Sequence, residues 1–215
     1  MRKIVKIGER RVINIILRAL DVMPGMPIPF GDDASAVEME DGKLAVLKTD
    51  MLVGKTDVPP GMGLREAARK AVVMNISDMA AKGVKPEAIL VSLGLPSELT
   101  SDDVKLIGEG LNIGAREYNT YIIGGDTNEA SDLVISCSVL GFCDREKFIR
   151  RDGARPGDIV AVTGFFGRTA LGLKVLLDGL PIPRDMRDSI LEAVLMPKAR
   201  LKEGLALAET GAVTS

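Results

Sequence analysis

The sequence predicts an α+β fold, in which strands outnumber the helices between them. Apolar, β-branched runs bounded by turn residues predict strands. These runs lie at 43–52, 88–96, 120–126, 133–142 and 158–164. Apolar residues recur with helical spacing at 9–20, 64–82, 102–118, 168–178, 185–195 and 197–209. The chain has neither a GxGxxG nor a Walker sequence, which argues against a doubly wound sheet.

A charged stretch punctuated by Gly and Pro, DREKFIRRDGARPGD at 144–158, predicts a domain boundary. We therefore expect an N-terminal domain at 1–145. Residues 146–215 then begin a second domain.

Composition excludes several classes of function. The 215 residues are 46% hydrophobic, and the net charge of -2 gives no reason to expect nucleic acid or a membrane surface as a partner. No apolar run approaches the ~20 residues that span a bilayer. The first ten residues lack the apolar stretch of a signal peptide, so we expect a cytoplasmic protein. Cys137 and Cys143 fit buried, reduced thiols better than a disulfide or a metal pair.

The chain contains no histidine, which excludes Ser-His and Cys-His nucleophiles and ordinary zinc sites. Any chemistry must rest on carboxylates, hydroxyls, Lys, Arg and backbone amides. The carboxylates are therefore the first candidates for a functional site.

The first two acidic sites lie before and within the first predicted strand. Asp32 and Asp33 follow MPGMPIPFG, a stretch rich enough in Gly and Pro to predict a mobile loop at 23–35. Thr49 and Asp50 interrupt the apolar strand at 43–52. A hydroxyl beside a carboxylate is an oxygen-only ligand set that suits magnesium with phosphate.

The third acidic site is Asp78, on the predicted helix 64–82. It continues the stripe of Ala67, Ala71 and Met74 at spacings of four, three and four, so it faces the interior. An ionised group there is costly unless it is paired or binds a cation. The alternative is an Asp of the last turn that bonds to neighbouring backbone.

The fourth site is Asp126, in IGGDTN, where we expect a strand to end. Gly124 and Gly125 free the backbone just before the carboxylate. A polar turn is the alternative interpretation. Four acidic sites without His or Cys partners suggest a hard metal that carries phosphates. We expect Asp33, Asp50, Asp78 and Asp126 to converge in space.

The order and wording of these motifs carry a resemblance. GDDASAV, KTDMLV, AVVMNISDMAAKGVKP, IIGGDTN and RRDGARPGDIVAVTGFFG resemble the superfamily of ATP-dependent enzymes that includes aminoimidazole ribonucleotide synthetase and selenophosphate synthetase. TDMLV and NISDMAAKGVKP are similar to the thiamine-monophosphate kinase family within it. The resemblance runs from about residue 28 to the end.

The resemblance implies a fold, an assembly and a reaction. It implies an N-terminal ATP- and magnesium-binding domain whose strands form a β-barrel with a second subunit, so a homodimer. It implies transfer of the ATP γ-phosphoryl group to thiamine monophosphate. Matching positions imply magnesium ligands at Asp33, Thr49, Asp50, Asp78 and Asp126. They imply ATP contacts from Gly125, Asp126 and Arg151. Arg151 can also be read as a solvated charge.

This chain departs from the family pattern in three places. Where many members have a substrate-contacting His, it has Thr56 and Asp57, and Asp57 could bind a cationic heterocycle. Lys48 stands where relatives often carry a hydroxyl. The sequence ends at ETGAVTS, before an Asp-x-Ser-Asp-Gly segment of the relatives, so we expect an incomplete second domain.

Two other functions stay open. One is a module that dimerises and binds Mg-ATP without turnover. The other is a different superfamily member, such as a selenophosphate-synthetase-like or hydrogenase-maturation-type enzyme. Those relatives use a reactive Cys or Sec, whereas Cys137 and Cys143 lie in or just after a predicted core strand.

Overall fold

The fold is built on one mixed five-stranded sheet, in a computed structural model that describes residues 8–215. The strands are β1 (Ser35–Glu38), β2 (Leu44–Val53), β3 (Lys85–Leu95), β4 (Tyr121–Glu129) and β5 (Val134–Cys143). Their order across the sheet is β1-β2-β5-β3-β4. All neighbours are antiparallel except β3 and β4, which are parallel. The α+β prediction is confirmed.

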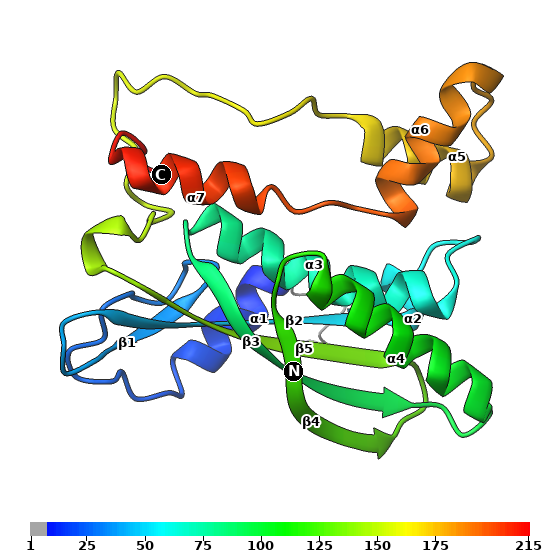
Figure 1. The fold of residues 1–215 in the computed structure, drawn as a ribbon, viewed down its shortest axis with the longest axis horizontal. Coiled ribbons are helices and arrows are strands. Elements are labelled where there is room, and N and C mark those ends of the chain that lie inside the picture. The colour runs from blue at the N-terminus through cyan, green and yellow to red at the C-terminus, as the bar shows by residue number, and fades with distance from the viewer. Residues whose placement is uncertain (1–7) are drawn as a thin grey trace.

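The helices are α1 (Glu9–Leu17), α2 (Gly54–Asp57), α3 (Leu64–Ala81), α4 (Ser101–Arg116), α5 (Arg168–Asp178), α6 (Arg184–Leu195) and α7 (Leu201–Thr210). Figure 1 shows α3 and α4 side by side over one face of the sheet, with α7 on the far side of α3. α4 links β3 to its parallel neighbour β4, as a parallel pair requires. Thr100 caps α4 through a reciprocal capping box with Asp103.

The core lies between the sheet and α3. In β2, Leu44, Val46 and Leu52 alternate onto this face and are fully buried. They meet Val72, Ile76 and Met79 of α3 in one cluster. The opposite face of the sheet is exposed in the described chain, and large side chains such as Leu47, Leu90 and Ile123 lie open on it. This face is available for another surface.

Two predicted strands differ from the structure. The predicted strand 158–164 is irregular chain, and Ile159 and Val160 are 93% and 92% exposed. No described strand lies beside it, and an extended segment becomes a strand only by pairing. β4 continues to Glu129, so Asp126 lies within a strand and not at its end.

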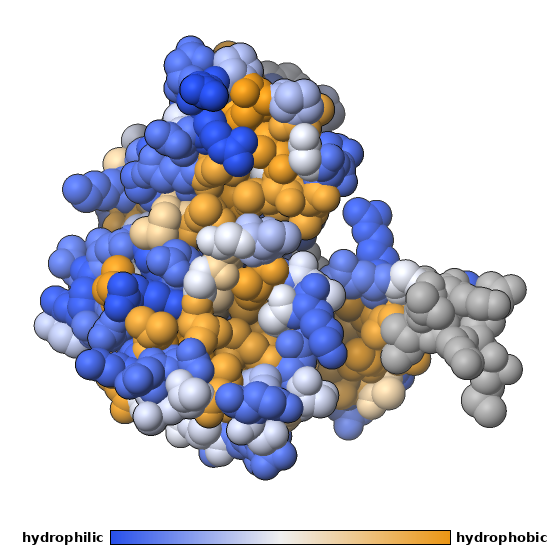
Figure 2. Space-filling model, turned by 90° about the vertical axis from the view of Figure 1, so that its right-hand side faces the viewer, coloured by the Kyte–Doolittle hydropathy of each residue, from blue (hydrophilic) through white to orange (hydrophobic). Residues whose placement is uncertain are grey.

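Apolar side chains gather in a band on the side where α5 and α6 stand above α2 (Figure 2).

Within residues 8–215, no helix has both the length and the apolar character needed to cross a membrane.

Candidate magnesium and nucleotide site

Asp50 and Asp78 face the same cavity. Asp50 lies on the α3 side of β2, and Asp78 lies near the end of α3 on the stripe that the sequence predicted. Both line a cavity of about 290 Å³, together with Ser77 and residues 197–199. Lys48, two residues before Asp50 on the same face, forms ion pairs of 2.5 Å with Asp78 and 3.9 Å with Asp50.

Asp32 and Asp33 are held by two basic residues. The buried Lys82, which follows α3, contacts Asp32 and lies 3.2 Å from Asp33. The Arg151 N–H donates to Asp32 Oδ2 at 2.9 Å, and the Arg151 guanidinium lies 3.1 Å from Asp33. Burial acts to raise the pKa of Asp32. The Arg151 N–H, the Lys82 ammonium and the Asp33 N–H outweigh it and lower that pKa.

Sequence reasoning missed the role of Lys82. The sequence feature that could have indicated this role is the position of Lys82, between the last turn of a buried helix and Gly83. Gly83 ends the helix with a left-handed φ of +67°. Lys82 and Arg151 both contact Asp33. Movement of the loop at 23–35 on binding Mg-ATP stays a prediction.

Arg151 and Asp33 line a second cavity, of about 450 Å³. Ser77 and Lys198 line both this cavity and the one beside Asp50 and Asp78. The structure therefore brings Asp33, Arg151, Asp50 and Asp78 to two adjoining cavities.

Asp126 and Thr49 lie on the other face of the sheet. Thr49 Oγ1 donates to the Cys137 carbonyl and accepts from the Ser138 hydroxyl, both at 3.1 Å. Asp126 is in register with Ser92 of β3, and β5 lies between β3 and β2. Within one chain, the structure therefore does not bring Asp126 to the other three carboxylates. The strand alternation and the two intervening strands are the reason.

Gly125 has a structural reason to be glycine. A Cβ at this position would overlap the Val91 carbonyl oxygen of β3. The β3–β4 pairing shifts register at Ile89/Leu90, just before this point. Close approach between strands thus requires Gly125, whether or not a phosphate also approaches it.

Asp57 supports the turn after β2. Its carboxylate accepts from the Val53 N–H at 2.7 Å, and Lys70 donates to its carbonyl oxygen at 2.6 Å. Burial lowers the pKa of Lys70, and the nearby Asp57 opposes that effect. Asp57 also lines a cavity of about 660 Å³ with Met62, Leu173 and other residues. Lys55 and Lys70 line the same cavity, so Asp57 is its one carboxylate beside two ammonium groups and several apolar side chains.

Arg69 and Tyr118 hold the segment that covers the acidic cavity. The buried Arg69 bonds Glu117 through two nitrogens and the Pro197 carbonyl at 2.9 Å through the third. The Ala199 N–H donates to the Tyr118 hydroxyl at 2.8 Å. No local motif predicts either contact, because both join residues far apart in the chain.

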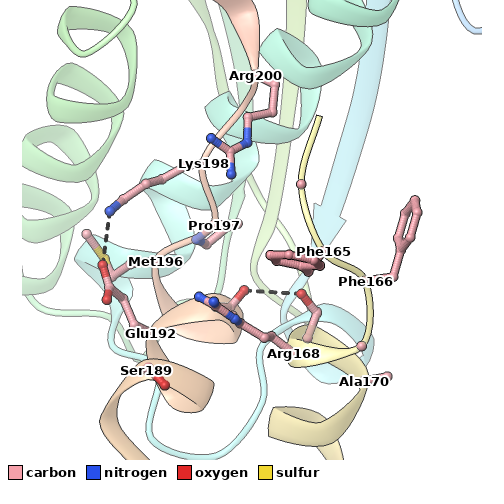
Figure 3. A pocket seen from close by; sticks show the side chains of 14 residues that line it. Phe165, Phe166, Arg168, Ala170, Ser189, Glu192, Met196, Pro197, Lys198 and Arg200 are labelled. Atoms are coloured by element: carbon pink, nitrogen blue, oxygen red, sulfur yellow. Dashed lines mark hydrogen bonds and ion pairs between the residues drawn. The ribbon is translucent and has the colours of Figure 1, made fainter. Parts of the chain in front are cut away.

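A larger cavity, of about 860 Å³, contains none of the predicted site residues. It lies between the loop before α5, α6 and the 196–200 segment (Figure 3). Phe165 and Arg168 reach it from one side, and Lys198, which pairs with Glu192, lies on the other.

The donor chemistry suits magnesium, with one complication. Two carboxylates that face one cavity fit an ion that takes its remaining ligands from water and phosphate. Lys48 forms an ion pair with each of these carboxylates. Among residues 8–215, no three His, Cys, Asp or Glu side chains are arranged to hold a metal by themselves.

Comparison with known proteins defines the class. Residues 31–143 match the family model described as AIR synthase related protein, N-terminal domain, so the chain belongs to that family. A thiamine-monophosphate kinase of Pyrococcus horikoshii is 40% identical over 202 residues, 94% of this chain and 62% of that protein. The thiamine-monophosphate kinase of Nitrosopumilus maritimus is 35% identical over 93% of this chain and 61% of its own length.

Solved structures agree with this assignment. A structure described as AaThiL complexed with AMPPCP and TMP has a TM-score of 0.85 and 27% identity, over 97% of this chain and 65% of that one. Hydrogenase maturation protein HypE, at 22% identity and a TM-score of 0.56, shares the fold. The chain spans about three fifths of the curated relatives cited here.

Proposed function

We propose that the chain binds Mg-ATP and phosphorylates thiamine monophosphate to thiamine diphosphate, with ADP as the second product. The similarity to thiamine-monophosphate kinases along nearly the whole chain carries this proposal. The adjoining cavities with Asp33, Asp50, Asp78 and Arg151 support it. With these substrates we expect the protein in the cytoplasm.

For this reaction the protein must neutralise the charges of the two phosphate groups and align the acceptor with the γ-phosphoryl group. The acceptor phosphate is already ionised at neutral pH, so no side-chain nucleophile is needed. Bound magnesium would neutralise the phosphate oxygens. Asp33, Asp50 and Asp78 would hold it on the helix side of the sheet. Arg151, next to Asp33, would contact the nucleotide, and Asp57 would face the cationic heterocycle.

A homodimer would bring Asp126 to this site. β1 pairs only with residues 44–47 of β2, so the outer edge of residues 48–53 has no strand partner in the described chain. β4 is the opposite edge of the sheet. If a second copy closes the sheet into a barrel, its β4 lies beside β2. Asp126 of the partner subunit then comes next to Thr49 on the exposed face, which becomes the barrel interior, and Asp50 follows Thr49 on the other side of this sheet edge.

The test is direct detection of thiamine diphosphate by chromatography after incubation with ATP, magnesium and thiamine monophosphate. We expect ADP and thiamine diphosphate in equal amounts, and loss of both in Asp50→Asn. Tight Mg-ATP binding without thiamine diphosphate would instead support the binding module.

Thiol chemistry of the kind used by other superfamily members finds no support here. Burial, with a further contribution from Asp50, raises the pKa of Cys137 to about 12. Burial, with Asp144 and Glu146, raises that of Cys143 to about 11. At neutral pH neither thiol supplies an appreciable thiolate.

A further inference from the structure

The pair Asp50 and Asp78 already has a cation within the protein. The Lys48 ammonium lies 2.5 Å from Asp78 and 3.9 Å from Asp50. Its side chain is 11% exposed, against 39% and 31% for the two carboxylates. The carboxylates line the cavity and Lys48 does not. The ammonium therefore lies on the inner side of the pair.

This placement has an electrostatic consequence. Two carboxylates at a partly buried site repel each other and need a counter-charge. Lys48 supplies one positive charge that is tethered to β2 and cannot diffuse away. A divalent ion that entered between the same oxygens would lie within a few ångströms of the ammonium and would be repelled by it.

We propose that Lys48 takes the place of one divalent ion in this cluster. It positions Asp50 and Asp78 before any metal binds, and it limits the number of ions that the pair admits. This inference rests on the proposed function only in assuming that these carboxylates hold the metal of Mg-ATP.

The decisive comparison is between wild type and Lys48→Met. Manganese binding without nucleotide is followed by calorimetry and by the electron paramagnetic resonance of free Mn²⁺. We expect Lys48→Met to bind one more ion, or to bind manganese at least about tenfold more tightly, since a repelling charge is gone. Lys85→Met is the matched control, because Lys85 pairs with Glu87 on an exposed strand position, and it should bind manganese as wild type does.

Thermal unfolding gives a second measurement. With a chelator, Lys48→Met should melt at a lower temperature than wild type, and manganese should restore it, because binding to the folded state raises its stability. Should Lys48→Met not fold in chelator, the double variant Lys48→Met/Asp78→Asn should fold without metal and lose the gain in manganese affinity.

Equal manganese stoichiometry and affinity in wild type and Lys48→Met would overturn the inference. The inference would also be overturned if Lys48→Met/Asp78→Asn bound manganese as tightly as Lys48→Met does. Neither result depends on thiamine diphosphate formation. A third result separates the two proposals. If Lys48→Met gains manganese binding while the wild type makes no thiamine diphosphate, the kinase proposal is overturned and the role of Lys48 stays intact.

Discussion

At the scale of single residues, the Asp32–Lys82 ion pair joins the loop before β1 to the end of α3. Both side chains are buried, at 6% and 4% exposure. Asp32→Asn leaves the Lys82 charge with Asp33 alone. We expect it to lower the free energy of unfolding by about 3 kcal/mol, as for other broken buried pairs. Urea unfolding measures this, with Asp152→Asn, from an exposed pair, as the control.

The same pair predicts a pH dependence. The pKa of Asp32 is lower in the folded protein, so its contribution is present above the unfolded pKa and is lost as pH falls through the folded one. The stability difference between wild type and Asp32→Asn should therefore be constant near neutral pH and shrink below about pH 4. A difference that grows on acidification would contradict this sign.

For Asp126 we expect a loss of activity without a loss of stability. It is exposed, and no hydrogen bond of its carboxylate occurs within the described residues. Asp126→Asn should therefore unfold at the same denaturant concentration as wild type while phosphoryl transfer falls by orders of magnitude, because shape is kept and charge is lost. Activity near wild type would remove Asp126 from the site.

These residues show what the sequence could and could not reveal. Spacing predicted that Asp78 faces inward, because helical periodicity is local. It could not reveal that Lys48 holds Asp78 or that Lys82 holds Asp32, because each of these two ion pairs joins different elements. It also suggested a single cluster, whereas the strand order separates Asp126 from Asp50.

At the scale of elements, α3 and α4 approach closely through glycine. A Cβ on Gly110 would overlap the Arg65 carbonyl oxygen and lie 2.9 Å from the Ala68 Cβ. Gly110→Ala should therefore cost about 1–3 kcal/mol of unfolding free energy through overpacking. Gly108→Ala, on the same helix with open space around it, should stabilise by up to about 1 kcal/mol. Equal effects of the two substitutions in thermal unfolding would contradict the packing.

Elements were predictable where their signal is local. The prediction of 64–82 as helix matches α3, because buried residues recur along the helix from Ala67 to Ala80. β1, only four residues long, was missed, since it forms by pairing with β2. Segment 158–164 has the composition of a strand without a described partner, so composition alone misled the prediction.

At the scale of the whole molecule, the proposed function requires a dimer. Leu47, Leu90 and Ile123 lie on the uncovered sheet face, and a barrel with a second copy would bury them. Light scattering at micromolar concentration should give twice the mass of one chain. Leu90→Glu should give the mass of one chain, because it places a charge on the face that the barrel would bury. A wild-type monomer would contradict the assembly.

In the proposed dimer, two copies of the chain share each nucleotide site, with Asp50 from one and Asp126 from the other. Mixing subunits of Asp50→Asn and Asp126→Asn and measuring Mg-ATP bound at equilibrium tests it most directly. Each variant alone should bind poorly. A shared site predicts that the random mixture recovers about one quarter of the wild-type sites, because half the dimers are mixed and each has one intact site. Binding by the mixture no greater than by either variant alone would show that each site lies within one chain and would contradict the claim.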